Sequence, residues 1–190
     1  MGRCKDFDEE TVLQKALECF WQNGYEATST RDLAQAMGIS YGSVYNTFRD
    51  KRTLYLAALD LYISRYAQTV VQQLNEATSA RAALAELLTQ VIDASVTDAA
   101  GCFAGNAIAA FAHRDPEVAG KVRAMNRSIE RAIQQLLERA QKADELTLEH
   151  DPAMIAYLII NTMSGIRLTA RLDKDQKKLH RMTQVVLSLL

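Results

Sequence analysis

Apolar residues recur at helical spacing from one end of this 190-residue chain to the other. No segment shows the pattern of a half-buried strand, in which apolar and polar residues alternate between paired turn signals. Helices bury stripes of this kind by packing against one another. The pattern therefore predicts an all-α fold of about nine helices, in a chain long enough to bury a core of its own.

Capping residues and prolines mark where the expected helices begin and end. Asp115-Pro116 and Asp151-Pro152 each place an N-cap residue before a proline at the first helical position, so both pairs open a helix. Asn23-Gly24 and Gly38 stand where a helix ends. The helices are expected from near Asp8 to Asn23, from Ser29 to Gly38, over 41–48, from Arg49 or Asp50 to near Asn75, around 84–92, over 103–111, from Asp115 to Ala140, from Asp151 onward and from after Asp173 to Leu189, with a loop at 97–101.

The composition argues against several classes of protein. With a net charge of -1 and 48% hydrophobic residues, the chain is neither disordered nor strongly charged. Cys4, Cys19 and Cys102 are far apart and form no CxxC pair, so we expect reduced thiols and neither a disulfide framework nor a zinc cage. The longest apolar run, 153–160, is far shorter than the roughly 20 residues that span a bilayer, and the start lacks the apolar segment of a secretory signal. We therefore expect a cytoplasmic protein that does not enter a membrane.

The expected helix 41–48 has a small apolar face and a large polar one. At about 100° per residue, Val44 and Phe48 fall together and are expected to be buried. A helix that buries two side chains and exposes small and hydrogen-bonding ones is suited to the major groove of DNA. The residues expected to face outward are Gly42, which lets the backbone come close to the duplex, Ser43 and Asn46, with Tyr41 and Tyr45 flanking the two faces.

A cluster of basic residues follows this helix. Arg49, Lys51 and Arg52 lie at the start of the next one, where backbone N–H groups also favour phosphate. Periodicity alone is equally compatible with a compact helical hairpin that has no role in DNA binding.

The stretch TSTRDLAQAMGISYGSVYNTFRDKRTLYLAAL resembles the DNA-binding signature of the TetR family, and the preceding VLQKALECFWQNGYEATS resembles that family's first helix. The resemblance covers residues 8 to 59, with the glycine turn, the aromatic pair in VYNTF and the following lysine at the family's spacing. It implies a DNA-binding transcription regulator, a repressor that a small hydrophobic or electrophilic effector releases from a pseudo-palindromic operator.

The same resemblance assigns roles to residues. It implies a DNA-binding domain over residues 1–50 and a ligand-binding and dimerisation domain over 51–190. Asn46 stands where many members carry histidine or tyrosine, so the operator sequence stays open. The residues implied to bind DNA are Thr30 and Arg31 at the start of the supporting helix, Tyr41, Ser43, Tyr45 and Asn46 in the recognition helix, and Lys51 at a phosphate. Gly42 is expected to bind DNA as well, because it lies on the outward face of the recognition helix.

The helix expected to begin at Pro152 is apolar on every side over 153–160, so it must be covered on every side. The last expected helix is similarly apolar. Packing both against the same two helices of a second copy gives a two-fold four-helix interface, which resembles the TetR-family dimer. The alternative is a monomer in which both helices are central.

Polar residues on otherwise apolar helices indicate a ligand cavity, because such cavities are mostly apolar with a few convergent polar groups. The residues expected to line it are Tyr62, Tyr66, Cys102, Asn106, Tyr157 and Asn161. His113 and Arg167 belong to the same helices. Structural interpretations stay open: Asn106 satisfies a backbone group, His113 lies at a helix end, or Arg167 pairs with an acid at a dimer interface.

Cys102 follows Gly101 at an expected helix start, where the helix dipole favours a thiolate. Some TetR-family proteins with a Gly-Cys pair here sense electrophiles or oxidants; the alternative is a small buried side chain. The chain has no HExxH, ExxH, GxGxxG or Walker motif, so no enzyme, metal or cofactor is expected. A helical small-molecule-binding protein or an enzyme, in either case without DNA binding, is the remaining alternative.

Overall fold

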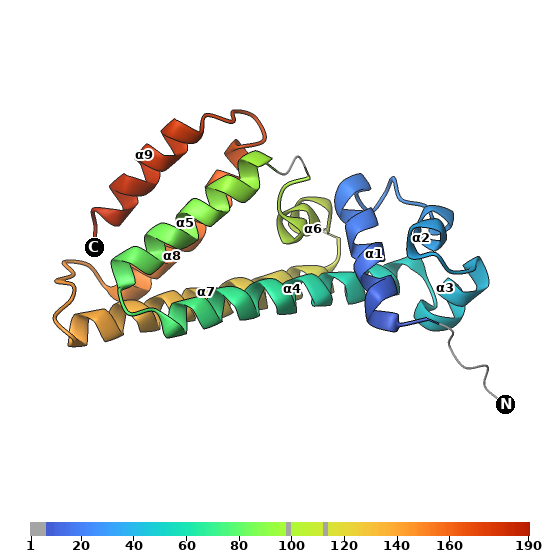
Figure 1. Ribbon diagram of the computed structural model, residues 1–190, viewed down its shortest axis with the longest axis horizontal. Coiled ribbons are helices and arrows are strands. Elements are labelled where there is room, and N and C mark those ends of the chain that lie inside the picture. The colour runs from blue at the N-terminus through green and yellow to red at the C-terminus, as the bar shows by residue number, and fades with distance from the viewer. Residues whose placement is uncertain (1–6, 98–99, 112–113) are drawn as a thin grey trace.

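The computed structural model describes residues 7–97, 100–111 and 114–190, and this part of the chain contains nine helices and no strand, which confirms the all-α prediction (Figure 1). None of these helices is both long and apolar enough to span a bilayer. The helices are α1 (Glu9–Asn23), α2 (Thr30–Met37), α3 (Tyr41–Phe48), α4 (Lys51–Glu76), α5 (Ala80–Thr97), α6 (Phe103–Phe111), α7 (Pro116–Lys142), α8 (Pro152–Thr169) and α9 (Gln176–Leu187).

The first three helices form a head at one end of the molecule, packed around the first turns of α4 (Figure 1). Phe20 of α1, Leu33 of α2 and Leu54 of α4 are fully buried there. Val44 and Phe48 of α3 are buried as well, as the periodicity predicts. Because α3 uses only these two residues for packing, the rest of its surface faces outward.

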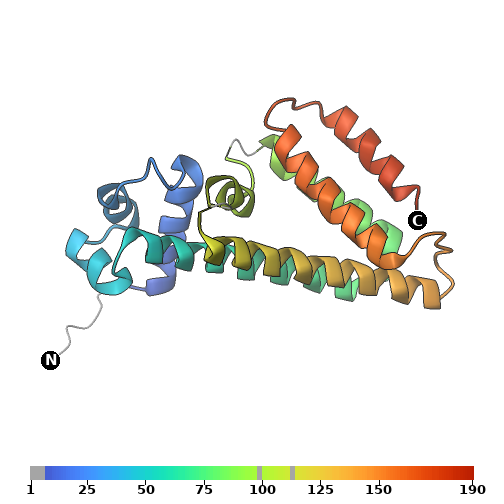
Figure 2. The same cartoon turned by 180° about the vertical axis from the view of Figure 1, so that it is seen from behind.

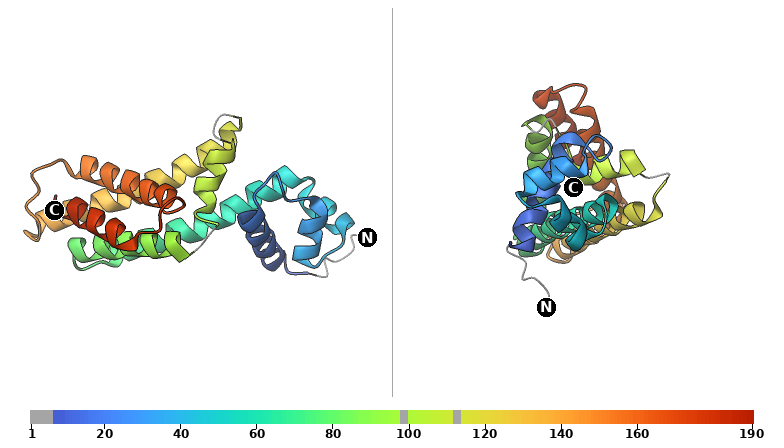
Figure 3. Two further views of the ribbon diagram at one scale, coloured as in Figure 1. Left: turned by 90° about the horizontal axis from the view of Figure 1, so that it is seen from above. Right: turned by 90° about the vertical axis from the view of Figure 1, so that its right-hand side faces the viewer.

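The remaining helices form the body. α4 passes from the head into the body and runs beside α7 (Figure 3). α7 packs on α8, and α5 packs on both α8 and α9. α6 is a short helix between head and body, in contact with α4 and α7 (Figure 1). Seen from behind, α8 lies on the near side of the body with α9 beside it (Figure 2).

Two expected boundaries are wrong by a few residues. α9 begins later than expected because its N-cap is Asp175, whose carboxylate accepts the N–H of Lys178 at 3.0 Å. Asp173 instead accepts the N–H of Asp175 at 3.2 Å and closes a turn ahead of the helix. Thr97 belongs to α5 and not to the loop, and its hydroxyl donates to the carbonyl of Asp93 at 2.7 Å within the last turn.

The segment from α2 to α3 is set by local caps. The Ser29 hydroxyl accepts the N–H of Asp32 at 3.2 Å, and the Asp32 carboxylate accepts the N–H of Ser29 at 2.8 Å, the reciprocal pair of a capping box. Gly38 ends α2 with a φ of 71°, in the left-handed region that favours glycine. The angle at which α3 follows α2 therefore depends on Gly38.

We expect opposite effects from replacing two glycines by alanine. Gly38→Ala should lower the free energy of unfolding by about 1 kcal/mol, because alanine is strained in the left-handed region. Gly120→Ala should raise it by about 0.5 kcal/mol, because Gly120 lies inside α7 with open space where a Cβ would stand. Urea denaturation monitored by circular dichroism measures both. A Gly38→Ala variant as stable as the native protein would contradict the role given to this turn.

Candidate nucleic-acid interface and internal cavities

The outward face of α3 carries two linked tyrosines. Tyr41 is 51% exposed and Tyr45 is 42% exposed. Their ring centroids are 4.8 Å apart, and the Tyr41 hydroxyl donates to that of Tyr45 at 3.2 Å. This hydrogen bond raises the pKa of Tyr41. The pair therefore presents two hydroxyls side by side on the surface of the head.

The other residues predicted to bind DNA lie around this pair. Gly42 and Asn46 are exposed, whereas Ser43 is half-buried, with its Oγ 2.8 Å from that of Ser40. At the start of α2, Thr30 is half-buried and Arg31 is exposed. α2, which carries Thr30 and Arg31, packs on α3.

The predicted basic cluster is divided by the structure. Lys51 stays with the head, its Nζ 4.3 Å from the centroid of the Tyr25 ring. Arg52 turns to α7: its Nε and Nη2 donate to the two carboxylate oxygens of Asp115 at 2.9 and 3.1 Å, and Nη2 also donates to Glu117 at 2.8 Å. Arg52 therefore ties α4 to the start of α7.

Aromatic rings connect the head to the body. Tyr25, in the loop after α1, contacts Phe111, the last residue of α6, at 4.9 Å between ring centroids, and Tyr55 of α4 at 5.0 Å. Tyr55 contacts Phe103 at 5.4 Å, and Phe103 contacts Tyr62 at 5.7 Å. The sequence analysis missed this cluster, because its members are far apart in the chain and share no periodicity.

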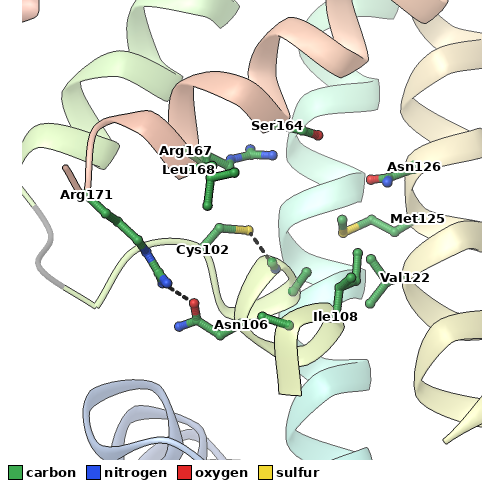
Figure 4. A pocket seen from close by; sticks show the side chains of 13 residues that line it. Cys102, Asn106, Ile108, Val122, Met125, Asn126, Ser164, Arg167, Leu168 and Arg171 are labelled. Carbon is green, nitrogen blue, oxygen red and sulfur yellow. Dashed lines mark hydrogen bonds between the residues drawn. The ribbon is translucent and has the colours of Figure 1, made fainter. Parts of the chain in front are cut away.

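Two neighbouring cavities lie in the body. One, of about 280 Å³, is bounded by α6, α7 and α8; it is lined by residues that include Asn106, Met125, Ser164 and Arg171 (Figure 4). The other, of about 350 Å³, is bounded mainly by α1, α4 and α5. Cys102 and Arg167 line both cavities, so these two side chains stand in the wall between them. The second cavity is lined by Trp21, Tyr62, Tyr66, Thr69, Val70, Gln73, Leu87, Gln90, Val91, Ala94, Ser95, Gly101, Cys102 and Arg167.

The structure gathers four of the six predicted cavity residues and leaves two outside. Tyr62, Tyr66 and Cys102 line the larger cavity, and Cys102 and Asn106 line the smaller. Tyr157 and Asn161 line neither, because the side of α8 that carries them faces away from the core. Tyr157 is 53% exposed, and the Asn161 side chain donates to its carbonyl at 2.7 Å. His113 and Cys4 lie outside the described residues.

Residues around α6 hold its start in place. The Asn106 side chain donates to the carbonyl of Ala100 at 2.8 Å, so its structural interpretation is confirmed. Arg171 donates to the same carbonyl at 3.0 Å and to the Asn106 side chain. Gly101 has a φ of 67°, and a Cβ there would lie 2.7 Å from Nη2 of Arg171. The backbone before Cys102 is therefore closely packed.

Cys102, Tyr62, Tyr66 and Arg167 form a polar cluster in the wall of the larger cavity. The Cys102 Sγ lies 3.4 Å from the Tyr62 hydroxyl and accepts the N–H of Gly105 at 3.4 Å. Arg167 donates to the Tyr66 hydroxyl, and its guanidinium carbon lies 5.3 Å from the centroid of that ring. Burial raises the pKa of both Tyr62 and Tyr66, so these phenols stay protonated.

No group of three or more His, Cys, Asp or Glu side chains in the described part of the chain could hold a metal ion. The polar groups of the cavities are instead a thiol, phenols, hydroxyls, amides and two guanidinium groups. Such groups bind small molecules by hydrogen bonds and by charge.

Known proteins share this arrangement. Family models match residues 12–58, as bacterial regulatory proteins of the tetR family, and 79–186, as the tetracyclin repressor-like C-terminal domain. The HTH-type transcriptional repressor ComR of Escherichia coli K12 is 32% identical over 191 residues, which cover 99% of this chain and 91% of ComR. The HTH-type regulator YezE of Bacillus subtilis 168 is 30% identical over the full length of both chains. A cysteine mutant of the TetR-family regulator CifR, solved with 26-base-pair operator DNA, is 26% identical, with 98% of both chains covered and a TM-score of 0.79.

The two described cysteines should differ in reactivity. Cys19 is 9% exposed and burial raises its pKa, so little thiolate forms at neutral pH and its labelling should quicken only as the pH rises. Cys102 lines two cavities and should react first with a disulfide reagent such as DTNB. Peptide mass spectrometry of a Cys4→Ser background at pH 7.5 distinguishes the two sites. Labelling of Cys19 before Cys102 would contradict the cavity geometry.

Proposed function

The chain belongs to the TetR family of transcriptional regulators, and we propose that it is a homodimeric repressor. In this proposal residues 1–50 bind a pseudo-palindromic operator, and the protein releases the operator when residues 51–190 bind a small effector. Its full-length relatives are regulators, so we assign it no enzymatic activity and no cofactor, and we place it in the cytoplasm with its DNA. The proposal rests on the outward face of α3, a helix of which only Val44 and Phe48 are buried. Caps at Ser29 and Ser40 fix the helix-turn-helix that holds this face outward.

For DNA binding, we assign base and backbone contacts to different residues. Asn46, exposed on α3, is suited to reading a base edge with its amide. Tyr41 and Tyr45 carry hydroxyls that can donate to phosphate oxygens. Lys51 stands at the start of α4, where its ammonium and the helix N-terminus together favour a phosphate. Thr30, Arg31, Gly42 and Ser43 complete the proposed interface.

The surface of α8 and α9 supports a dimer. Large apolar side chains are exposed on both helices, and no other described helix covers α8 from behind (Figure 2). Tyr157, placed by its sequence position in a cavity, belongs to this surface. We propose that these side chains form one apolar patch, which a second copy covers by two-fold symmetry. Its members are Met154, Tyr157, Leu158, Leu168, Met182, Val185 and Leu189.

The effector signal has a contiguous route to the head. An apolar effector in either cavity, or an electrophile at the Cys102 thiol, acts at the first turn of α6. The last residue of α6, Phe111, contacts Tyr25, and the ring of Tyr25 supports Lys51. Just beyond α6, Asp115 holds Arg52 of α4. We propose that a shift of α6 against α4 changes the spacing of the two heads in the dimer.

Lys51→Gln should weaken binding to all DNA sequences alike and make the slope of log K against log salt shallower by about 1, because one phosphate contact is lost. Asn46→Ala should instead change base preference and leave the salt slope unchanged. Lys142→Gln, at the exposed end of α7, is the matched control. Fluorescence anisotropy with labelled operator at several salt concentrations measures this. An unchanged slope for Lys51→Gln would contradict the docking geometry.

Leu158→Asp and Val185→Asp should convert the dimer to a monomer at micromolar concentration, because each places a charge in the proposed apolar interface. Leu158 is 40% exposed and Val185 is 68% exposed, so neither change should unfold the chain. Gln135→Asp, on the exposed side of α7, is the control and should leave assembly unchanged. Light scattering, with circular dichroism as the folding check, decides. A native protein that is monomeric under these conditions would rule out this interface.

A further inference from the structure

Arg167 is a cation on the core side of α8, and within the described part of the chain no acidic side chain pairs with it. Its guanidinium donates to the Tyr66 hydroxyl and lies against the Tyr66 ring. Among the described residues, the ion pairs join Arg52, Arg65 and Lys121 to acids, and none involves Arg167. This differs from the expectation that Arg167 pairs with an acid at a dimer interface: the side chain turns inward, toward α4 and Cys102 (Figure 4).

The neighbours of Arg167 do not neutralise its charge. The Tyr62 and Tyr66 phenols stay protonated, since burial raises the pKa of both. A guanidinium has five N–H donors, and a single hydrogen bond leaves most of them available. No fully buried side-chain nitrogen or oxygen in the described residues lacks a partner, so the remaining donors reach the space of the cavities. A partly desolvated cation of this kind is costly unless an anion joins it.

The cavity around this cation has the size and walls of a ligand site. Its volume of about 350 Å³ is within the range of small-molecule pockets. Arg167 is the sole charged residue among the described residues that line it. Trp21, Tyr62, Leu87 and Val91 provide apolar and aromatic wall. One positive charge in an otherwise neutral, largely apolar chamber matches a ligand with one negative charge and an apolar body.

We propose that the effector is a monocarboxylate with an aryl or alkyl body, whose carboxylate pairs with the guanidinium of Arg167 while the body lies against the wall formed by Trp21, Leu87 and Val91. The inference deepens the proposed function, on which it rests. A planar guanidinium matches a carboxylate with two parallel hydrogen bonds, a geometry that neutral ligands cannot provide. A dianion would keep one charge unpaired in this cavity.

Binding at Arg167 also has a consequence for α4. We assign the carboxylate to the guanidinium edge whose Nη2 donates to the Tyr66 hydroxyl, so that it displaces this hydroxyl. Tyr66 belongs to the helix that begins at Lys51. A bound carboxylate thus removes one link between α8 and α4 inside the body. An anion at this position acts on the element that carries the head.

The chain contains one tryptophan, and that residue lines the cavity, so Trp21 fluorescence reports binding directly. The probes are 3-phenylpropionate and octanoate, each compared with its neutral amide, with 3-phenylpropylamine as the cationic control. Titration of the native dimer should show saturable binding of both acids, at least tenfold tighter than the amides, and none of the amine. Comparing the two acids distinguishes an aryl from an alkyl body.

Variants distinguish the contribution of the Arg167 charge to binding from that of the cavity shape. Arg167→Gln should weaken the acids by about 10- to 100-fold and leave the amides unchanged, so that the preference disappears. Arg167→Lys should retain part of the preference. Tyr66→Phe, which removes the competing hydroxyl, should bind the acids at least as tightly as the native protein. Intact-mass spectrometry after each titration should show no added mass, which excludes a reaction at the Cys102 thiol.

Equal binding of acid and amide by the native protein would overturn the proposal. An Arg167→Gln variant that binds acids and amides equally weakly would overturn it too, because a purely structural role of Arg167 gives that result. The same titrations are repeated with labelled operator. Acids that bind through Arg167 and do not release the operator would overturn their assignment as effectors. A native protein that binds no operator would contradict the proposed function, and the fluorescence titration would still decide whether Arg167 binds a carboxylate.

Discussion

α4 is shared by the two halves of the molecule. Lys51 at its first residue belongs to the head, and Tyr66 belongs to the wall of the larger cavity. At about 1.5 Å per residue these two positions lie roughly 22 Å apart on one hydrogen-bonded element. Arg52 ties the first turn of α4 to Asp115 at the start of α7, and Lys121 of α7 holds Asp60 of α4 at 2.8 Å. The two long helices are therefore joined near the head, and the position of the head depends on them together.

α6 is the element best placed to move them. It is short, and its side chains are packed rather than ion-paired: Phe103 and Phe111 contact Tyr55, and Phe111 contacts Tyr25. Close-packed aromatic groups have few alternative arrangements, so a displacement at one end of the cluster is passed on rather than absorbed. The start of α6 is held by Asn106 and Arg171 around the carbonyl of Ala100. A ligand that disturbs this start acts on the cluster and, through it, on the head.

Local chemistry explains which features could be predicted from the sequence. The helix starts at Asp8 and Ser29 depend on neighbouring residues alone, and so does the burial of Val44 and Phe48 on one side of α3. These features were predicted correctly. The sequence analysis expected α9 to follow Asp173, whereas its N-cap is Asp175. Either aspartate can cap a helix, so the sequence alone does not distinguish two that are two residues apart.

Features that need the tertiary arrangement were not predicted. The hydrogen bond of Arg52 to Asp115 joins two distant segments, and nothing in the basic cluster around Arg52 indicates it. Tyr157 and Arg167 are both polar residues on one apolar helix, yet only Arg167 turns into the core. Periodicity places residues on a helix face but does not say which face meets a neighbour, because the apolar surface of α8 surrounds the helix.

The position of Cys102 and Arg167 in one wall limits how the two proposed kinds of effector relate to each other. An adduct on the Cys102 sulfur occupies space next to the Tyr62 hydroxyl, 3.4 Å away, which is where the body of a carboxylate on Arg167 would begin. The two events therefore compete for one region instead of acting at separate sites. Either one shifts the equilibrium only through its differential affinity for the form that does not bind DNA. A preference of about 100-fold for that form corresponds to about 2.7 kcal/mol. One charge-assisted hydrogen bond can supply a free energy of this size. Arg167 is free to make it, because it has no acidic partner in the described chain. One such contact is thus enough to make an anion an effective signal if it forms in the form that does not bind DNA and is absent from the form that does.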